Sequence, residues 1–110
     1  MVGAEVRRGD IFLVDLNPTR GGEIRKTRPC AIVSPDELNA HLRTAVVVPL
    51  TTGSHPYPFR VPCRFSGKNG HLVVDQVRTI DRERLQRRLG KLTPGTLTNV
   101  LAVLREMFAQ

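Results

Sequence analysis

The sequence contains little of what would tie it to a membrane, a metal ion or an oxidising compartment. No apolar run approaches the roughly 20 residues of a membrane-spanning helix, and the chain does not open on a charged-then-apolar leader. The two cysteines, Cys30 and Cys63, lie in apolar segments without metal-ligand spacing, and the three histidines form no HExxH pattern. We therefore expect a cytoplasmic protein with no metal site, cofactor or disulfide, in which both cysteines are small buried side chains.

Acidic residues are too few to balance the basic ones, and aromatic residues are scarce. Seventeen Lys and Arg against ten Asp and Glu leave a formal net charge of +7, and the basic residues are mostly arginine, which suits bidentate contacts to phosphate. The leading expectation is a polyanionic partner, with nucleic acid ahead of a membrane surface. Aromatic residues make up 5% of the chain, and tryptophan is absent. Any stacking of unpaired bases therefore rests on few rings, with Tyr57 and Phe59 as the candidates.

The apolar pattern predicts one domain, residues 1–110, built of many short strands. A chain of 110 residues with 40% hydrophobic residues is large enough for a single core. Apolar or alternating runs of strand length lie at residues 10–16, 29–34, 45–50, 60–65, 71–76 and 77–80. The Asn-Gly pair within Gly67–Gly70 favours a tight turn that joins the fourth and fifth strands into a hairpin.

Two helices are expected. Ser34, Pro35 and the acids after them predict a short helix that runs toward His41. The second helix has Thr93 as its cap and Pro94 as its first residue, and its apolar stripe is Leu97, Val100, Leu101, Leu104 and Phe108. The fold class that follows is mainly β (α+β): a small, strongly bent, SH3-like β-barrel with a short helix after the second strand and a C-terminal helix.

Residues 17–29, NPTRGGEIRKTRP, form a basic loop between two predicted strands. A glycine pair lets the backbone turn or approach a ligand closely, and arginine and lysine suit phosphate. The four cations of this loop are Arg20, Arg25, Lys26 and Arg28. We predict that the chain does its chemistry here, and the alternative is a solvated connection whose charges keep the protein soluble. A second basic stretch, residues 78–91, alternates with acids around Ile80, Leu85 and Leu89, which predicts a solvated surface with local ion pairs.

Four segments resemble the MazF/PemK-like toxins of bacterial toxin–antitoxin modules, and together they span nearly the whole chain. They read RGDIFLVDLNPTRGGEIRKTRPCAIVSPDELN, VVVPLTT, YPFRV and VVDQVRTIDRERL. The resemblance implies the bent barrel of PemK- and CcdB-like toxins and a metal-independent endoribonuclease that cuts single-stranded RNA, often mRNA, at short sequences. It also implies a homodimer and a cognate MazE-like antitoxin, whose acidic, disordered C-terminal tail would cover the basic groove.

The resemblance also implies a set of catalytic residues. The catalytic pair of the family falls on Arg28 and Thr51, and Glu23 matches a further position in the basic loop. Arg28 would stabilise transition-state charge and the leaving oxygen, and Thr51 would bond a phosphate oxygen. A guanidinium keeps its proton in proteins, so proton removal is left to Glu23 or to water. The bland alternatives are that Arg28 pairs with Asp15 or Glu23 to pin the loop, and that Thr51 bonds local backbone.

RNA recognition would involve the basic loop and residues 51–59. Unpaired bases in single strands are read by stacking and through their edges, and phosphates are held by cations. The predicted RNA-binding residues are Arg20, Arg25, Lys26, His55, Tyr57, Phe59, Gln76 and Arg78. For Phe59 the alternative is that it begins the next strand and points into the core.

Two other functions stay open from the sequence. The chain could be a gyrase-directed toxin of the same architecture that acts by binding a protein, because fold alone does not settle function. It could also be a basic RNA- or DNA-binding module without catalysis, for which the net charge of +7 would be sufficient.

Overall fold

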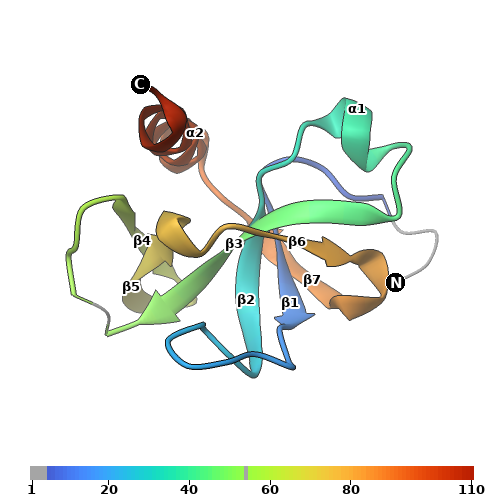
Figure 1. The fold of residues 1–110 in the computed structure, drawn as a ribbon, viewed down its shortest axis with the longest axis horizontal. Helices are drawn as coiled ribbons and strands as arrows, with labels where there is room; N and C mark the ends of the chain where they lie inside the picture. Colours follow the sequence, from blue (N-terminus) through green and yellow to red (C-terminus); the bar gives the residue numbers. More distant parts are fainter. Residues whose placement is uncertain (1–4, 54) are drawn as a thin grey trace.

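The computed structural model describes residues 5–53 and 55–110, which form a strongly bent antiparallel sheet with a long helix packed on it (Figure 1). The strands are β1 (Asp10–Asp15), β2 (Thr27–Ile32), β3 (Thr44–Thr52), β4 (Arg60–Phe65), β5 (Lys68–Val73), β6 (Arg78–Asp81) and β7 (Leu85–Lys91). The helices are α1 (Asp36–Asn39) and α2 (Pro94–Phe108), with 3₁₀ turns η1 (Val74–Gln76) and η2 (Arg82–Arg84). The predicted mainly β class, with a short helix after the second strand and a C-terminal helix, is confirmed.

The sheet bends at β3, its central strand. Residues 44–47 of β3 pair with β6, residues 47–49 pair with β2, and residues 50–52 pair with β5. The C-terminal end of β3 therefore leaves β2 and pairs with the β4–β5 hairpin. Within the described residues the strand order is β4-β5-β3-β2-β1-β7, and no ladder joins β4 to β7, so the sheet curves like a barrel but stays open.

The central strands bury both of their faces, because successive side chains of a strand point to opposite sides. Phe12 of β1 packs into a cluster with Val47 and Ile80, whereas its neighbour Ile11 packs into a second cluster that includes Val100 of α2. This double burial explains why these strands read as continuous apolar runs in the sequence.

The β4–β5 hairpin is confirmed, but its turn lies elsewhere than predicted. Phe65 pairs with Lys68, so the turn consists of Ser66 and Gly67 alone, which have φ angles of 51° and 75°. Positive φ at both central residues is what a type I′ hairpin turn requires. The Asn69-Gly70 pair that suggested the turn lies inside β5.

Two strand predictions need correction. Residues 71–76 were expected to be one strand, but β5 ends at Val73 and the chain turns through η1. Residues 78–91 were expected to be a solvated surface; most side chains of residues 85–91 are exposed, but these residues also form a strand that was not predicted, β7, which pairs with β1 at an edge of the sheet. The sequence of β7 lacks the apolar pattern of a strand, because β7 pairs on one side only, in an irregular register, and most of its side chains are exposed.

Helix α2 begins as predicted, with the Thr93 side chain accepting a hydrogen bond from the backbone N–H of Thr96 at 3.3 Å. Its buried stripe differs at the C-terminal end, because Val103 and Met107 pack on the core while Phe108 is 74% exposed. Leu101, also predicted for the stripe, is half-buried and lies outside the core clusters, which contain Leu97, Val100 and Leu104.

Helix α1 is confirmed as a short excursion, although Ser34 does not cap it. The cap position belongs to Pro35, and the Ser34 hydroxyl instead donates to Asn39 Oδ1 at 2.6 Å and accepts from the Val46 N–H at 3.0 Å. The buried Ser34 and Asn39 thus tie α1 to β3.

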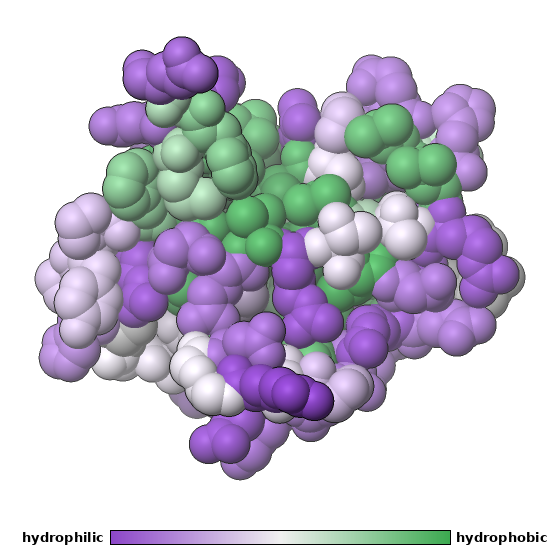
Figure 2. Space-filling model, viewed as in Figure 1, coloured by the Kyte–Doolittle hydropathy of each residue, from purple (hydrophilic) through white to green (hydrophobic). Residues whose placement is uncertain are grey.

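Apolar side chains gather on one face of the molecule. Figure 2 shows them over α2 and across the middle of the sheet, with a further group over α1. A cavity on this face is lined by Leu104 and Phe108 of α2 together with Val46, Val77 and Leu38. No helix among the described residues is long and apolar enough to span a membrane.

Candidate active site

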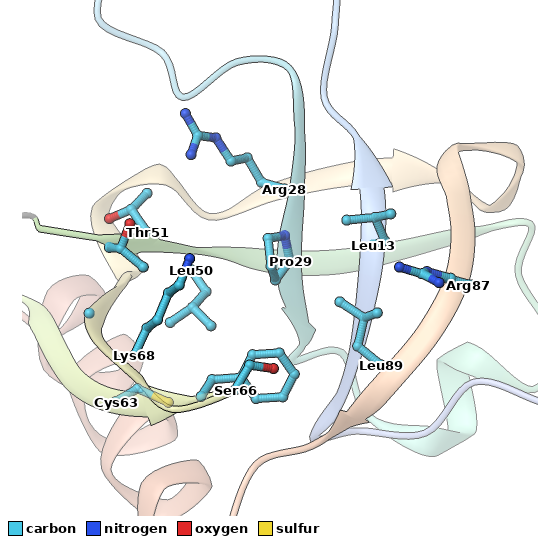
Figure 3. A pocket seen from close by; sticks show the side chains of 13 residues that line it. Leu13, Arg28, Pro29, Leu50, Thr51, Cys63, Ser66, Lys68, Arg87 and Leu89 are labelled. Carbon is cyan, nitrogen blue, oxygen red and sulfur yellow. The ribbon is translucent and has the colours of Figure 1, made fainter.

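Arg28 of β2 and Thr51 of β3 line the same cavity, to which β1, β4, β5 and β7 also contribute side chains (Figure 3). Its volume is about 410 Å³, within the range of small-molecule sites. The side chains that line it are Leu13, Arg28, Pro29, Leu50, Thr51, Thr52, Cys63, Phe65, Ser66, Lys68, Arg87 and Leu89, with Gly70 between them. The cavity therefore has an apolar floor, hydroxyl groups and cations, and no carboxylate among the described residues that line it.

The guanidinium of Arg28 is held by the loop that precedes it. Arg28 is half-buried, and its Nε donates to the backbone oxygen of Arg25 at 3.3 Å. It forms no ion pair with any carboxylate in the described part of the chain, so a structural pairing with Asp15 or Glu23 is not found. Its positive charge is available to a ligand in the cavity.

Thr51 has a buried hydroxyl without a partner. Among the described side chains, its Oγ1 is the buried polar atom that finds no hydrogen bond, so the local backbone bond considered from the sequence is absent. Leaving such a group unsatisfied costs about 1 to 3 kcal/mol, and native proteins rarely do so without reason. Because less than 1 Å² of Oγ1 is accessible, a ligand oxygen in the cavity would bond this hydroxyl only after the Thr51 side chain turns toward it.

Gly70 allows β5 to approach β3 at Thr51. A Cβ at Gly70 would lie 2.0 Å from the Thr51 backbone oxygen, which no side chain can tolerate. The glycine is therefore needed for this close approach and not for a turn, which is why the Asn-Gly signal in the sequence misplaced the turn. The contact determines where Thr51 lies relative to the cavity.

The part of the basic loop that precedes β2 closes on itself around Glu23. The Glu23 carboxylate accepts a hydrogen bond from the Arg20 N–H, and the Glu23 N–H donates to the Arg20 oxygen at 3.1 Å. Glu23 lines a neighbouring cavity with Gln76 and Arg78, and not the one that holds Arg28 and Thr51. Of the predicted catalytic residues, the structure brings Arg28 and Thr51 to one cavity and leaves Glu23 at the next.

Gln76 and Arg78, both predicted to bind RNA, hold this loop in place. The Gln76 side chain accepts from the Ile24 N–H at 2.6 Å and donates to the Gly22 oxygen at 3.1 Å. Arg78 donates to the Leu16 oxygen at 3.0 Å. Their polar groups are thus engaged with loop backbone. The loop cations Arg20, Arg25 and Lys26 are exposed, as phosphate contacts would require.

The loop between β3 and β4 presents aromatic side chains, although its residue 54 lies outside the described residues. The Arg60 guanidinium lies 4.8 Å from the Tyr57 ring centroid, and His55 meets the same ring edge-on at 5.9 Å. Asp75 holds Arg60 through two contacts of 3.2 and 3.3 Å. Tyr57 is 56% exposed and Phe59 39% exposed, so Phe59 does not point into the core. Phe59 has a φ of 63°, a strained conformation for a bulky residue.

The stretch at residues 78–91 is not the simple ion-paired surface that its sequence suggested. Several of its arginines donate to backbone oxygens: Arg84 reaches Asp15 at 3.0 Å, and Arg82 reaches Leu42 at 3.1 Å. Ion pairs of this region include Arg88 with the buried Asp10, at 3.0 Å. These arginines connect loops that lie far apart in the sequence.

Both cysteines have raised thiol pKa values. Burial raises the pKa of Cys30 from 9.0 to about 12, against a smaller opposing effect of the Arg78 cation. Burial also raises the pKa of Cys63, which is half-buried and lines the cavity of Arg28 and Thr51. Within the described residues, no three His, Cys, Asp or Glu side chains are grouped so that they could hold a metal ion.

Comparison with known families gives this arrangement its context. The model of the PemK-like, MazF-like toxins of type II toxin–antitoxin systems matches residues 7–108, nearly the whole chain. The chain belongs to this toxin family. The resemblance read from the four sequence segments is thereby confirmed.

Two curated MazF proteins are each more than a third identical to this chain over the aligned residues. Endoribonuclease MazF9 of Mycobacterium tuberculosis is 36% identical over 112 residues, covering 91% of this chain and 93% of that protein. Endoribonuclease toxin MazF of Escherichia coli K12 is 35% identical over 95 residues, covering 86% of each chain. Both relatives carry the name of an RNA-cutting enzyme.

Solved MazF structures share the fold. A MazF from Deinococcus radiodurans superposes with a TM-score of 0.86 at 24% identity, covering 97% of this chain and 99% of that one. An endoribonuclease from a mycobacterial species, solved in complex with its cognate antitoxin, superposes with a TM-score of 0.77 at 27% identity, covering 92% of each chain. The strongly bent sheet with its C-terminal helix is thus the MazF-like fold.

Sequence reasoning missed two cations of this MazF-like site, Lys68 and Arg87. Lys68 follows the hairpin turn, and Arg87 lies on the edge strand β7 that the sequence did not reveal. A correct hairpin register would have placed Lys68 near the end of β3, because Gly70 pairs with Thr52. No pattern in the sequence distinguishes Arg87 from the arginines beside it.

Proposed function

We propose that this toxin-family protein is a metal-independent endoribonuclease that cuts single-stranded RNA, mRNA above all, at short sequences. The observation that carries this proposal is the cavity that Arg28 and Thr51 line together, with an unpartnered Thr51 hydroxyl and no carboxylate in its described lining. The names of the curated relatives support the same activity. An uncompensated guanidinium and a free hydroxyl suit a phosphodiester, whose charge grows in the transition state.

The proposed reaction uses the RNA as its own nucleophile. The 2′-oxygen loses its proton and bonds to the neighbouring phosphorus, and the bond from phosphorus to the 5′-oxygen breaks. The leaving oxygen takes up a proton, so the products end in a cyclic 2′,3′-phosphate and a 5′-hydroxyl. The enzyme therefore has to orient the RNA, stabilise the phosphorane charge and assist two proton transfers.

Arg28 and Thr51 supply charge stabilisation in this scheme. The Arg28 guanidinium contacts the phosphorane and the leaving oxygen, and it keeps its proton throughout. The Thr51 hydroxyl donates to a phosphate oxygen, which gives the buried Oγ1 its partner. The bond between Glu23 and the Arg20 N–H supports an orienting role for Glu23. Water then takes the proton from the 2′-oxygen, and water also supplies the proton that the leaving 5′-oxygen takes up.

RNA would run from this cavity across the two adjoining loops. The exposed Arg20, Arg25 and Lys26 would contact phosphates, and Tyr57 with Phe59 would offer faces for unpaired bases. His55 would act beside Tyr57, whose ring it touches. Gln76 and Arg78 would act from behind the basic loop, because their polar groups are bonded to its backbone.

We also propose an antitoxin partner and a homodimer. A mycobacterial relative was solved with its cognate antitoxin, and an acidic antitoxin tail would compete with RNA for the same uncompensated cations. The apolar cavity beside Leu104, Phe108 and Leu38 supports a contact with a second copy of the chain, because large exposed apolar patches commonly mark interfaces.

Incubation of the purified protein with an unstructured RNA in the presence of a chelator tests the function. We expect cutting, with cyclic-phosphate ends, and a loss of roughly 10²- to 10³-fold in the single-turnover rate for Arg28→Ala. Arg105→Ala, which removes an exposed arginine on α2, is the matched control.

The outcomes separate the three functions considered from the sequence. Retention of the RNA without cutting would favour a binding module. If the protein neither binds nor cuts the RNA, the gyrase-directed toxin remains, and inhibition of purified gyrase would then identify it. A folded Arg28→Ala protein that cuts at the wild-type rate would remove Arg28 from the mechanism.

A further inference from the structure

Two cations beyond Arg28 surround the cavity of Arg28 and Thr51. Lys68 extends from β5, and its amine reaches up toward Leu50, while Arg87 extends inward from β7 on the opposite side (Figure 3). Neither forms an ion pair with a carboxylate in the described part of the chain. The cavity thus brings together Arg28, Lys68 and Arg87 without a compensating acid.

This clustering is unfavourable in the free protein. Like charges gathered around one cavity repel one another, and the field that they create favours an anion there. The part of the cavity beside Arg28 and Thr51 has room for one phosphate. The Arg87 side chain enters from the far wall, beside Leu13 and Leu89, so it faces a different part of the same cavity. The charges are therefore spread as a ligand with more than one anionic group would require.

Between the cations the cavity has an apolar floor. Pro29, Leu50 and Phe65 contribute to it, and a single nucleoside fits a volume of about 410 Å³. A bound peptide would need hydrogen-bond partners for its backbone along this floor, and the apolar side chains of the floor offer none. A flat, largely apolar ring flanked by phosphates matches it better.

We propose that this cavity is a nucleotide subsite, in which the floor takes one base next to the cut, Lys68 contacts the strand on the side of Thr51, and Arg87 holds the phosphate on the far side of that nucleotide. The inference deepens the proposed function and rests on it. It assigns both cations to substrate binding, and Arg87 also to register, because the phosphate that Arg87 holds is not the one that reacts. The nucleotide that they anchor would fix which linkage lies at Arg28 and Thr51.

Binding of an uncleavable strand tests the subsite apart from catalysis. The probe is a short fluorescein-labelled deoxyoligonucleotide of mixed sequence, which lacks the attacking hydroxyl, and its affinity is measured by anisotropy at several salt concentrations. Lys68→Met and Arg87→Gln should each weaken binding and lower the log–log salt slope by roughly 0.7, the value for one neutralised phosphate of a single strand. Lys91→Met and Arg105→Gln remove equal charge from exposed positions outside the cavity lining and should leave the slope unchanged.

Cys63 offers a second readout that needs no catalysis. It lines the cavity and is half-buried, whereas Cys30 is fully buried and should remain silent toward a thiol reagent. Adenosine 3′,5′-bisphosphate, a base between two phosphates, should slow the modification of Cys63. Deoxyribose 3′,5′-bisphosphate, which lacks the base, should protect less. Protection should be lost in the Lys68→Met, Arg87→Gln double variant.

The cutting assay completes the test, because it measures the effect on KM separately from the effect on the single-turnover rate. With RNA, Arg87→Gln should raise KM several-fold and leave the single-turnover rate at saturation near that of the wild type, in contrast to Arg28→Ala. Unchanged binding, salt slope and Cys63 protection in both variants would overturn the subsite even if the protein cuts RNA. If the RNA stays intact while the variants still change the salt slope and the bisphosphate still protects Cys63, the nuclease function would be overturned and the nucleotide site would stand.

Discussion

At the scale of single residues, the site depends on groups that the fold leaves unsatisfied. The hydroxyl of Thr51 is buried without a partner, and the cations of its cavity have no acid beside them. Each of these features costs stability in the free protein. Both become favourable when a phosphodiester enters, so the same atoms that weaken the fold would bind the substrate.

Thr51→Val separates these two effects. Valine has nearly the shape of threonine without the hydroxyl, so the free energy of unfolding should stay the same or rise by up to about 1 kcal/mol. The single-turnover cutting rate should fall by roughly 10²-fold or more, as for the loss of one oxyanion donor. Urea unfolding and RNA cutting measure the two quantities. Thr44→Val, at the other end of β3, is the control, and a Thr51→Val protein as active as the wild type would contradict the assigned role.

Cys30 predicts a dependence of stability on alkaline pH. Below pH 9.0 its thiol is protonated in the folded and unfolded chains alike; above this pH the unfolded chain loses the proton, while the folded chain keeps it up to about pH 12. The unfolded state then binds fewer protons, so stability should fall as pH rises, by at most about 1.4 kcal/mol per pH unit. Urea unfolding of wild type and Cys30→Ala between pH 8 and pH 11, compared as a difference, measures this slope. Parallel curves would show that Cys30 does not contribute.

At the scale of elements, the short turn η1 connects the two loops that adjoin the cavity. Gln76 bonds the backbone of the basic loop on one side, and Asp75 holds Arg60, which stacks on Tyr57, on the other. Neither loop has regular structure to determine its shape, so these side-chain bonds do so. The Lys26 backbone, at a φ of 70°, is one strained point that they help to maintain.

Gln76→Ala should therefore loosen the basic loop. Each of the two lost hydrogen bonds is worth about 1 kcal/mol, so global stability should fall modestly. Trypsin should cut after Arg20, Arg25 or Lys26 several-fold faster than in the wild type, and RNA cutting should slow. Mass spectrometry of the digest measures the first effect. Gln86→Ala, exposed on β7, is the control, and an unchanged digestion rate would show that the loop is held by other bonds.

At the scale of the whole molecule, two different surfaces are left open. One is the cationic cavity at the meeting of β2, β3, β5 and β7, and the other is the apolar face beside α2 (Figure 2). A charged surface suits a polyanion, and an apolar one suits a protein contact. The two proposed partners, RNA and a second copy, thus have separate places.

Phe108→Glu tests the apolar face. Phe108 is 74% exposed and makes little contribution to the core, so the variant should fold. A charge buried without a partner in an interface is costly, so the dimer should dissociate at concentrations where the wild type remains paired. Light scattering after size exclusion measures this. Ala102→Glu adds the same charge at another exposed position of α2. A Phe108→Glu protein with the wild-type mass would place the dimer contact elsewhere.

Local chemistry was sufficient for most of the elements. The apolar runs predicted the central strands because both of their faces are buried, and the Thr93-Pro94 start predicted α2 because capping depends on neighbouring residues. The resemblance placed Arg28 and Thr51, and the structure brings both to one cavity. The loop bonds of Gln76 could not be read from its sequence position, because its partners lie more than 50 residues away.

The sequence by itself determined the composition of charge, the strand and helix segments and the family of this toxin, since these depend on residue type and on short-range periodicity. Only the tertiary structure decided which arginines face a common space, why Gly70 stands against Thr51, and that Lys68 and Arg87 join the cavity. The physical reason is that β3 bends away from β2 and onto β5. That bend brings together side chains from strands whose order in space no local pattern encodes.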